Sequence, residues 1–302
     1  HDNTAVGYSA LVNNETASFN TAVGAFSLYN NTGQNNVAVG YKALEQNKAA
    51  SNTATGFSAL QGNSIGDNNS AIGYKALQNN SSSSFNPYYP YGNSAFGSYA
   101  LANNFSGFNN TAVGNEAGYQ LPNNVSNVTC IGAFTGWNTT TSNQVNIGNF
   151  GVTWIGGQTG WFTYSDKRMK NDIKDDVPGL AFITHLKPVS YRVDVRKQEE
   201  IANNGKNPDS ELNKNAQKDW EGKYDVEKIK MTGFLAQDVE EVAKSLNYPF
   251  NGVHNPKNGG LYSLNYSEFV VPLVKAVQEQ QTIIEKQQKQ IDDLMKRMAA
   301  LE

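Results

Sequence analysis

The sequence feature that most constrains the fold is an internal repeat that covers residues 3–148. Its units are variants of the pattern Asn-Thr-Ala-Val-Gly, which several units follow with Tyr-x-Ala-Leu, and neighbouring units are offset by 16 to 18 residues with one exception. The marked glycines are Gly7, Gly24, Gly40, Gly56, Gly73, Gly97, Gly114, Gly132 and Gly148. A period this short is unsuited to a helical hairpin and favours the coils of a β-solenoid or β-roll, each with two short strands joined by turns.

Each repeat carries only a small set of apolar side chains. An alanine lies two residues before the glycine, an aliphatic residue directly before it, and Ala and Leu three and four residues after it. One unit cannot bury this set alone, so we expect the coils to stack around a continuous narrow core, with the glycines at tight turns. Cys130 occupies an alanine position and is therefore predicted to be a small buried residue. As the single cysteine, it also excludes an internal disulfide framework.

The exception to the spacing is an insertion of residues 81–92, which lengthens the offset between Gly73 and Gly97 to 24 residues. It contains Tyr88, Tyr89 and Tyr91, and exposed tyrosines can stack on sugar rings. We therefore name these three as candidate binding residues for a cell-surface glycan or receptor. The alternative is a loop that packs on a neighbouring chain. The repeats contain no paired-carboxylate, histidine-rich or phosphate-cradling motif, so we expect neither a metal nor a cofactor.

An abrupt change of composition divides the chain at Ser165. Residues 1–164 contain three lysines, no arginine and five acidic residues, whereas residues 165–302 contain 21 basic and 22 acidic residues. Such a change marks a domain boundary. We predict a repeat domain over 1–148, capping strands and a cleavage junction over 149–164, an α+β domain over 165–266 and a C-terminal helix over 267–302. In the junction, large aromatic residues such as Trp154 and Trp161 are expected to cover the end of the solenoid.

The boundary itself carries possible chemistry, because Ser165 and Lys170 are five residues apart. Serine is a weak nucleophile that needs a base, and a lysine can serve as that base where burial lowers its pKa. Five residues would place the two side chains on opposite faces of a straight strand, so a turn, a helix start or a neighbouring chain must bring them together. The alternative is an ordinary solvated turn between domains.

The region after the boundary has an α+β pattern. Residues 189–195 alternate as a strand does, and residues 230–235 form a second candidate strand. Residues 236–246 are predicted to be a helix with Val239, Val242 and Leu246 on one side. The charged stretch 197–221 between the strands is interpreted as a long exposed excursion.

The last 36 residues show a heptad pattern that is typical of a coiled coil. We expect the helix to start with Ser267 as its N-cap or at Pro272, or to bend at that proline. Steps of four and three residues link the apolar seam, which two glutamines weaken. The seam consists of Leu273, Val277, Gln280, Ile284, Gln287, Ile291, Leu294, Met298 and Leu301.

Two known groups of proteins resemble the two halves of this chain. Ser165, Asp166, Arg168, Lys170 and Ile173 match the S-D-x-R-x-K-x-x-I signature of the peptidase S74 family, the C-terminal intramolecular chaperone domain of phage tailspikes and tail fibres. Residues 186–191, 233–240 and 264–273 also resemble that family. The repeats are similar, more loosely, to the N-x-A-x-G head repeats of trimeric adhesins and of phage or bacterial fibres.

These resemblances imply a homotrimeric fibre or adhesin, located in a virion tail fibre or at a cell surface, with a trimeric β-solenoid and a trimeric C-terminal coiled coil. The chaperone domain is expected to drive trimer assembly and then remove itself in a single turnover as a self-cleaving serine endopeptidase. The family implies Ser165 as nucleophile and Lys170 as base. Asp166 and Arg168 are assigned to orientation or ion pairing, and Asn171 and Gln237 are weaker candidates for an oxyanion hole.

A second hypothesis is a structural adhesin stalk that keeps the C-terminal domain as a permanent trimer clamp. Other classes find no support in the sequence. The net charge of −3 gives no basic footprint for nucleic acid, and no window of 18 apolar residues indicates membrane insertion. A polysaccharide-degrading tailspike is not supported either, because the acidic residues of the repeats are scattered.

Overall fold

The computed structural model describes residues 2–81, 89–137, 139–202, 219–256 and 259–301. Contacts between α-carbons divide the chain into two compact units. The first unit combines His1–Thr153 with Val195–Asp225, and the second combines Trp154–Asp194 with Val226–Glu302. The described residues of a later segment, 195–202 and 219–225, therefore pack with the repeats.

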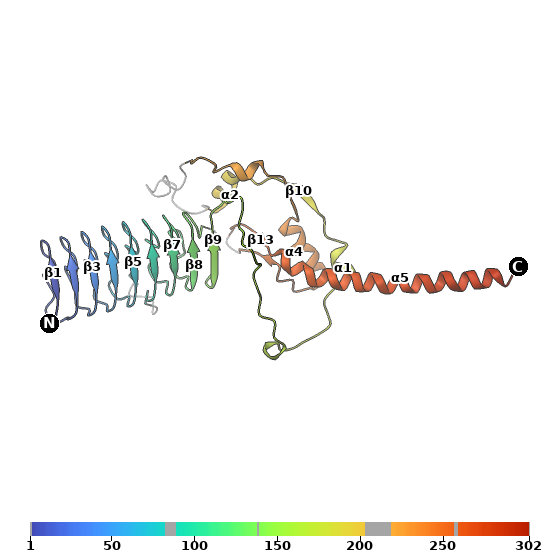
Figure 1. The fold of residues 1–302 in the computed structure, drawn as a ribbon, viewed down its shortest axis with the longest axis horizontal. Coiled ribbons are helices and arrows are strands. Elements are labelled where there is room, and N and C mark those ends of the chain that lie inside the picture. The colour runs from blue at the N-terminus through green and yellow to red at the C-terminus, as the bar shows by residue number, and fades with distance from the viewer. Residues whose placement is uncertain (1, 82–88, 138, 203–218, 257–258, 302) are drawn as a thin grey trace. The chain divides into compact units, whose positions relative to one another are not determined.

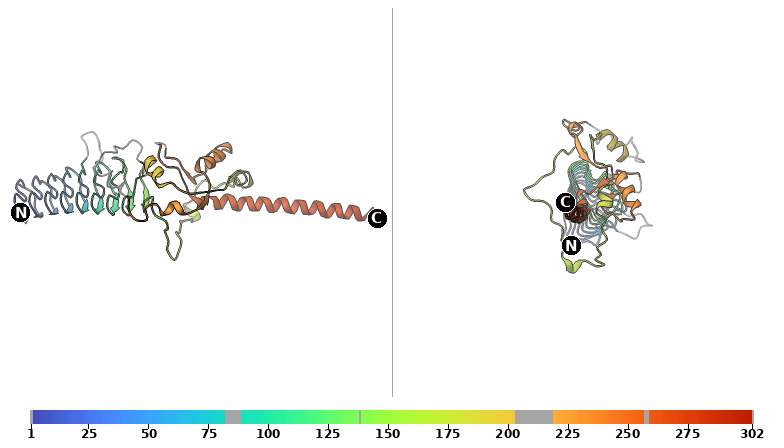
Figure 2. Two further views of the ribbon diagram at one scale, coloured as in Figure 1. Left: turned by 90° about the horizontal axis from the view of Figure 1, so that it is seen from above. Right: turned by 90° about the vertical axis from the view of Figure 1, so that its right-hand side faces the viewer.

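The repeats form one parallel sheet in which each strand pairs with the next along the chain, as Figure 1 shows. Equivalent positions face each other, so that Ala22 pairs with Ala38 and Ala38 with Ala54. Figure 2 shows the same row of coils from above. The predicted β-solenoid is confirmed. Its strands are β1 (Thr4–Val6), β2 (Thr21–Val23), β3 (Val37–Val39), β4 (Thr53–Thr55), β5 (Ser70–Ile72), β6 (Ser94–Phe96), β7 (Thr111–Val113), β8 (Val128–Ile131) and β9 (Gln144–Ile147).

Each described coil has one short strand where we predicted two. The reason is the turn that follows the strand, which uses left-handed backbone at two non-glycine residues, Lys42 (φ 56°) and Leu44 (φ 51°) in the third coil. The glycine before them is also constrained. Gly40 has φ +133°, and a Cβ there would lie 2.5 Å from the carbonyl oxygen of Gly56 in the next coil. A chain that turns this sharply has no room for a second strand.

The core of the solenoid consists of the predicted alanine and leucine columns, all of which are buried in the middle coils. Cys130 pairs with Ala112 in the register of β7 and β8 and is 0% exposed. Burial raises the pKa of its thiol to about 11. The interpretation of Cys130 as a small buried residue is confirmed, and the raised pKa makes it a poor thiolate nucleophile.

Buried asparagines connect the coils in two ladders. In the first, the backbone N–H of Asn36 donates to Oδ1 of Asn20 in the coil before, at 2.9 Å, and Asn52 repeats this contact with Asn36. In the second, Nδ2 of Asn47 donates to Oδ1 of Asn31 at 2.8 Å, and Nδ2 of Asn63 donates to Oδ1 of Asn47 at 2.9 Å. The repeated asparagines therefore join successive coils, besides bonding to turns within one coil.

The solenoid ends differently from our prediction. Residues 152–166 contain no strand, and Trp154, Trp161, Phe162 and Tyr164 are exposed. Three glycines, at 156, 157 and 160, interrupt this segment, and an isolated pair of short strands is marginally stable in water. The last coils are covered instead by Trp137, Phe150 and Ala202, and Ala202 belongs to helix α2 (Val195–Ala202).

Helix α2 also corrects the interpretation of 197–221 as an exposed excursion over residues 197–202, which are helical and end at the buried Ala202. Residues 203–218 of that stretch lie outside the described residues. The 3-10 turn η2 (Asp225–Lys228) follows.

The second unit has a compact α+β core and one long helix. Strand β10 (Val189–Tyr191) pairs antiparallel with β11 (Met231–Gly233), and β12 (Val253–His254) pairs with β13 (Ser263–Leu264). Helix α1 (Leu180–Ile183) and helix α4 (Ala236–Ser245) bury Phe182, Val239 and Ala243 together. Val242 and Leu246 pack against this cluster, so the predicted apolar side of α4 is confirmed.

The C-terminal helix α5 (Val270–Ala299) is 30 residues long and follows the 3-10 turn η3 (Tyr266–Phe269). Asn265 caps η3 by accepting from the backbone N–H of Ser267, so Ser267 is not the N-cap that we predicted. Pro272 lies in the first turn of α5. Backbone N–H groups in a first turn make no hydrogen bond within the helix, so the N–H that proline lacks is not needed there and the helix does not have to bend. The apolar seam residues from Leu273 to Leu301 are exposed in the single chain. No described helix has the length and apolarity needed to span a membrane.

One ladder residue offers a test of the coil-to-coil contacts. Asn63 is fully buried, donates to Asn47 and to the carbonyl of Gly66, and accepts from Nδ2 of Asn80 at 2.8 Å. We expect Asn63→Ala to lower the free energy of unfolding by about 1 to 3 kcal/mol, because it leaves buried polar groups unsatisfied. Urea unfolding followed by circular dichroism measures the change. Asn13→Ala removes an exposed contact between coils and should change the free energy of unfolding by less than about 0.5 kcal/mol. If both variants lost the same free energy of unfolding, burial of the Asn63 contacts would not be what stabilises the stack.

A buried carboxyl makes the solenoid sensitive to pH. Glu116 is 3% exposed and stands two residues after Gly114, where other coils carry Lys42 or Lys75. Burial raises the pKa of this carboxyl to about 7, against a hydrogen bond from Asn115 that lowers it. The native chain therefore keeps a proton that the unfolded chain loses above about pH 4.5.

Stability should consequently fall as the pH rises from about 4.5 through 7, by on the order of 1 to 3 kcal/mol. We expect Glu116→Gln to unfold at a higher temperature than the wild type at pH 8 and at nearly the same temperature at pH 4. Thermal melts at both pH values provide the measurement. If the melting temperatures of the wild type and the variant differ by the same amount at pH 4 and at pH 8, Glu116 does not titrate in this range.

Candidate cleavage site

The stretch that begins at Ser165 folds into a single 3-10 turn, η1 (Lys167–Met169). Asp166 caps this turn, because its Oδ1 accepts from the backbone N–H of Arg168 at 2.9 Å. The turn closes through two backbone hydrogen bonds of 3.2 Å, from Met169 N–H to the Asp166 carbonyl and from Lys170 N–H to the Lys167 carbonyl. The chain is extended at Asp166 and again at Lys170. The turn therefore folds the two ends of the motif back toward each other.

This local fold brings the two predicted catalytic side chains together. Nζ of Lys170 lies 2.7 Å from Oγ of Ser165 and donates a hydrogen bond to it. The five-residue spacing is compatible with this contact because η1 interrupts the extended chain. A neutral lysine amine at this distance can accept the hydroxyl proton, so the geometry suits a nucleophile and its base.

Asp166 and Arg168 pair with each other beside these two residues. Nε of Arg168 lies 3.0 Å from both carboxylate oxygens of Asp166. The side-chain hydrogen bond from Arg168, together with the one from its backbone N–H, holds the pKa of Asp166 below its usual value. An exposed ion pair adds little stability, so its main effect here is to fix the conformation of η1.

Ser165, Lys170 and all other residues from 161 to 176 are exposed in the single chain. Water therefore reaches both members of the pair. In the part of the chain that the structure describes, neither Asn171 nor Gln237 is hydrogen-bonded to Ser165 or Lys170, and Gln237 is an exposed residue of the first turn of α4. Their role as oxyanion donors stays a prediction.

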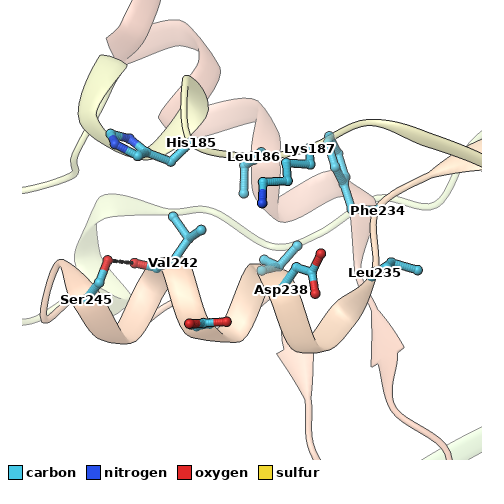
Figure 3. A pocket seen from close by; sticks show the side chains of 10 residues that line it. His185, Leu186, Lys187, Phe234, Leu235, Asp238, Val242 and Ser245 are labelled. Carbon is cyan, nitrogen blue, oxygen red and sulfur yellow. Dashed lines mark hydrogen bonds between the residues drawn. The ribbon is translucent and has the colours of Figure 1, made fainter.

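Two of the other motifs noted in the sequence line a common cavity of about 340 Å³ in the second unit (Figure 3). Residues 185–187, after α1, form one wall. The other is formed by Phe234, Leu235 and five residues of α4, namely Asp238, Val239, Glu241, Val242 and Ser245. Lys187 and Asp238 point into the same space. The lining includes no residue of the stretch 165–173, so this cavity is not part of the Ser165–Lys170 pair.

The tyrosine-rich insertion leaves the solenoid without changing its register, since Ala71 of β5 pairs directly with Ala95 of β6. Tyr89 and Tyr91 are exposed, and the ring of Tyr91 stacks on Phe108 with centroids 5.2 Å apart. Tyr88 lies outside the described residues. Among the residues that can be described, no group of three or more His, Cys, Asp or Glu could hold a metal ion.

The sequence did not predict a cluster of aromatic and charged side chains at the end of the solenoid. Phe134 stacks on Trp220, and Lys223 pairs with Glu199. The available signal was Trp220 itself, a tryptophan in a highly charged stretch, because a residue of this size is rarely left fully exposed.

A parallel β-solenoid followed by an α+β domain and a long helix defines a fibre-like protein with a separate C-terminal domain. Residues 165–249 match the family model Peptidase_S74, which is described as the chaperone of endosialidase. The match begins at Ser165 and includes β10, β11 and α4. Residues 165–249 are therefore similar to the chaperone domain of this family, and the whole arrangement fits a tailspike or fibre protein with a C-terminal chaperone. Searches of curated proteins and of solved structures each returned no match.

Proposed function

We propose that this chain forms a homotrimeric fibre whose C-terminal chaperone domain drives trimer assembly and then removes itself by cutting a peptide bond next to Ser165. The observation that carries the proposal is the 2.7 Å contact between Nζ of Lys170 and Oγ of Ser165, at the first residue of the match to the chaperone family.

The cut proceeds by nucleophilic catalysis. Lys170 in its neutral form takes the proton of the Ser165 hydroxyl, and Oγ attacks the neighbouring backbone carbonyl carbon. The peptide C–N bond breaks, and the proton passes from Nζ to the amine that leaves. Water then hydrolyses the ester that Ser165 has formed and releases a carboxylate. Asp166 and Arg168 act as positioning residues, because they hold the turn that places Lys170.

Two exposed apolar surfaces support the homotrimer. The first is a row of side chains at the third position of the strands, including Val23, Val39, Ile72 and Val113, which are 36 to 44% exposed. The second is the seam of α5. Contiguous apolar surface of this kind indicates an interface, and a heptad seam on a single helix requires partner helices.

We infer an order of assembly from the non-local pairing of the solenoid. Aligning three solenoids requires contacts between distant residues in the correct register, and such pairing is slow. A trimeric coiled coil of α5 would first hold the three chains together, so that solenoid alignment becomes an intramolecular step. Loss of the chaperone then removes the route by which the fibre folded, and its stability becomes kinetic.

A permanent trimer clamp remains the second candidate, and one observation favours it. Lys170 is exposed in the single chain, whereas a lysine base requires an environment that favours the neutral amine. In this alternative the chaperone domain stays attached and the Ser165–Lys170 contact has no catalytic role.

The fibre-like fold and the chaperone match also support a location in a virion tail fibre or at a cell surface. For recognition of a glycan or receptor, the exposed Tyr89 and Tyr91 make the insertion our candidate contact. Tyr91 already uses one ring face against Phe108, which leaves its other face for a sugar.

Mass spectrometry under denaturing conditions distinguishes the two candidates. We expect two fragments that meet next to Ser165 in the wild type, and a single 32.9 kDa chain in Ser165→Ala and in Lys170→Ala. Lys167→Ala is the matched control, since it removes an exposed lysine of the same turn that does not contact Ser165, and it should be cleaved like the wild type. An intact chain in all four proteins would support the clamp.

The trimer is tested on α5. Ile284→Lys places a charge in the seam and should convert the trimer largely to monomer, because burying an unpaired ammonium costs several kcal/mol per chain. Thr282→Lys adds the same charge outside the seam and should leave the trimer intact. Size-exclusion chromatography with light scattering reports the mass. A trimer that survives Ile284→Lys would place the interface elsewhere.

A further inference from the structure

The proposed cleavage makes no use of a hollow in the surface of the solenoid. This hollow has a volume of about 310 Å³ and is lined by one phenylalanine, three serines and three asparagines that precede β7, β8 and β9. All seven belong to the same compact unit as the repeats. None of these lining residues, all of which the structure describes, carries a charge. The volume lies at the lower end of the range for small-molecule sites, which begins at about 300 Å³.

The hollow arises from a change in side-chain size along one column of the coils. The backbone N–H of Asn127 donates to the carbonyl of Phe108 at 3.0 Å. One coil further, the N–H of Asn143 donates to the carbonyl of Ser126 at 3.1 Å. The position in front of these bonds is occupied in successive coils by Tyr91, Phe108, Ser126 and Ser142. Two coils with aromatic rings are thus followed by two coils with small hydroxyl side chains, and the difference in volume leaves the surface hollowed.

The walls of the hollow are held in place by contacts within the solenoid. The ring of Tyr91 stacks on that of Phe108, with centroids 5.2 Å apart and an angle of 11° between the planes. Oγ of Ser126 accepts from the N–H of Phe108 at 3.1 Å, and Oγ of Ser142 accepts from the N–H of Ser126 at 3.0 Å. Each hydroxyl still has its own hydrogen to donate. A ligand would therefore meet groups that are already ordered, which lowers the entropy cost of binding.

Two exposed asparagines at the edge of the hollow form a side-chain pair. Nδ2 of Asn127 donates to Oδ1 of Asn143 at 2.8 Å. Among the contacts of the described residues, this bond uses neither Oδ1 of Asn127 nor Nδ2 of Asn143. The pair thus presents an acceptor and a donor side by side. A hydroxyl group both donates and accepts, so two neighbouring hydroxyls of one ligand can satisfy this pair.

We propose that the hollow binds a neutral sugar residue of a surface glycan, a hexose or an N-acetylhexosamine. The apolar C–H face of the sugar packs on Phe108, and its hydroxyls bond to Asn127 and Asn143. An anionic sugar is disfavoured, because a charge removed from water requires a paired cation and the lining provides none. The inference rests on the proposed recognition of a glycan, and it places the main contact in the coils beside the tyrosine-rich insertion.

The class of ligand is tested with the full chain on an array of immobilised oligosaccharides. One set ends in hexoses or N-acetylhexosamines, and the other ends in N-acetylneuraminic acid or glucuronic acid. We expect binding to be confined to the neutral set. Isothermal titration calorimetry with the neutral oligosaccharide that gives the strongest signal then measures the dissociation constant per chain for the wild type and for each variant.

Two variants change the hollow in different ways. Ser126→Tyr extends the column of rings into the hollow and should abolish measurable binding. Asn127→Ala removes one hydrogen-bonding side chain and should raise the dissociation constant roughly five-fold. Asn35→Ala is the matched control, since Asn35 is exposed and has the same left-handed backbone as Asn127, with φ of 57° against 55°. It should bind like the wild type. Because circular dichroism reports the folding of each variant, a misfolded one leaves the other as an independent test.

Three results would overturn the inference, each in a distinct way. Binding that Tyr89→Ala abolishes and Ser126→Tyr leaves intact would place the glycan on the insertion, so that glycan recognition stands and the hollow has no part in it. A preference for the anionic set would refute the neutral class. The absence of binding to every oligosaccharide would refute both the hollow and the proposed glycan recognition, without bearing on the fibre or on self-cleavage.

Discussion

The solenoid depends on hydrogen bonds that run between coils. Each strand is three or four residues long, and its backbone partners lie in the coils before and after it. The buried asparagines extend the same dependence to side chains, since Asn47 donates to Asn31 and accepts from Asn63. A single coil would leave these groups without partners, so coils gain stability only when neighbours are already in place.

Under the proposed function, this dependence gives the C-terminal chaperone domain its role. A growing stack needs a first coil that is held in the folded conformation, and the proposed trimer would also need a means to place three chains in register. The second unit has its own core around Phe182, and the apolar seam of α5 is exposed in the single chain. Within the single chain, Lys170 already contacts Ser165, but both residues are exposed to water. The distance suits a nucleophile and its base, whereas a lysine base also requires a buried environment that the single chain does not provide.

The sequence predicted features that repeat or that depend on local spacing. The coil period, the alanine position of Cys130 and the apolar side of α4 were accessible because each follows from a pattern along the chain. The aromatic residues that cover the solenoid were not, because Trp154 and Trp161 are nearer in sequence to the last coil than Trp220, and only tertiary packing decides between them. The contact of Lys170 with Ser165 required a turn whose presence the five-residue spacing alone did not establish.

The insertion of residues 81–92 has a consequence for how such a fibre can change over evolutionary time. The strands on either side of it, β5 and β6, keep the register of the sheet, with Ala71 opposite Ala95. The offset between Gly73 and Gly97 is 24 residues instead of 16 to 18, so six to eight extra residues have been accommodated without a change in strand register. An insertion between two strands can therefore add surface without changing the register of the sheet. The outer surface of the repeat domain can vary in this way while its core stays the same.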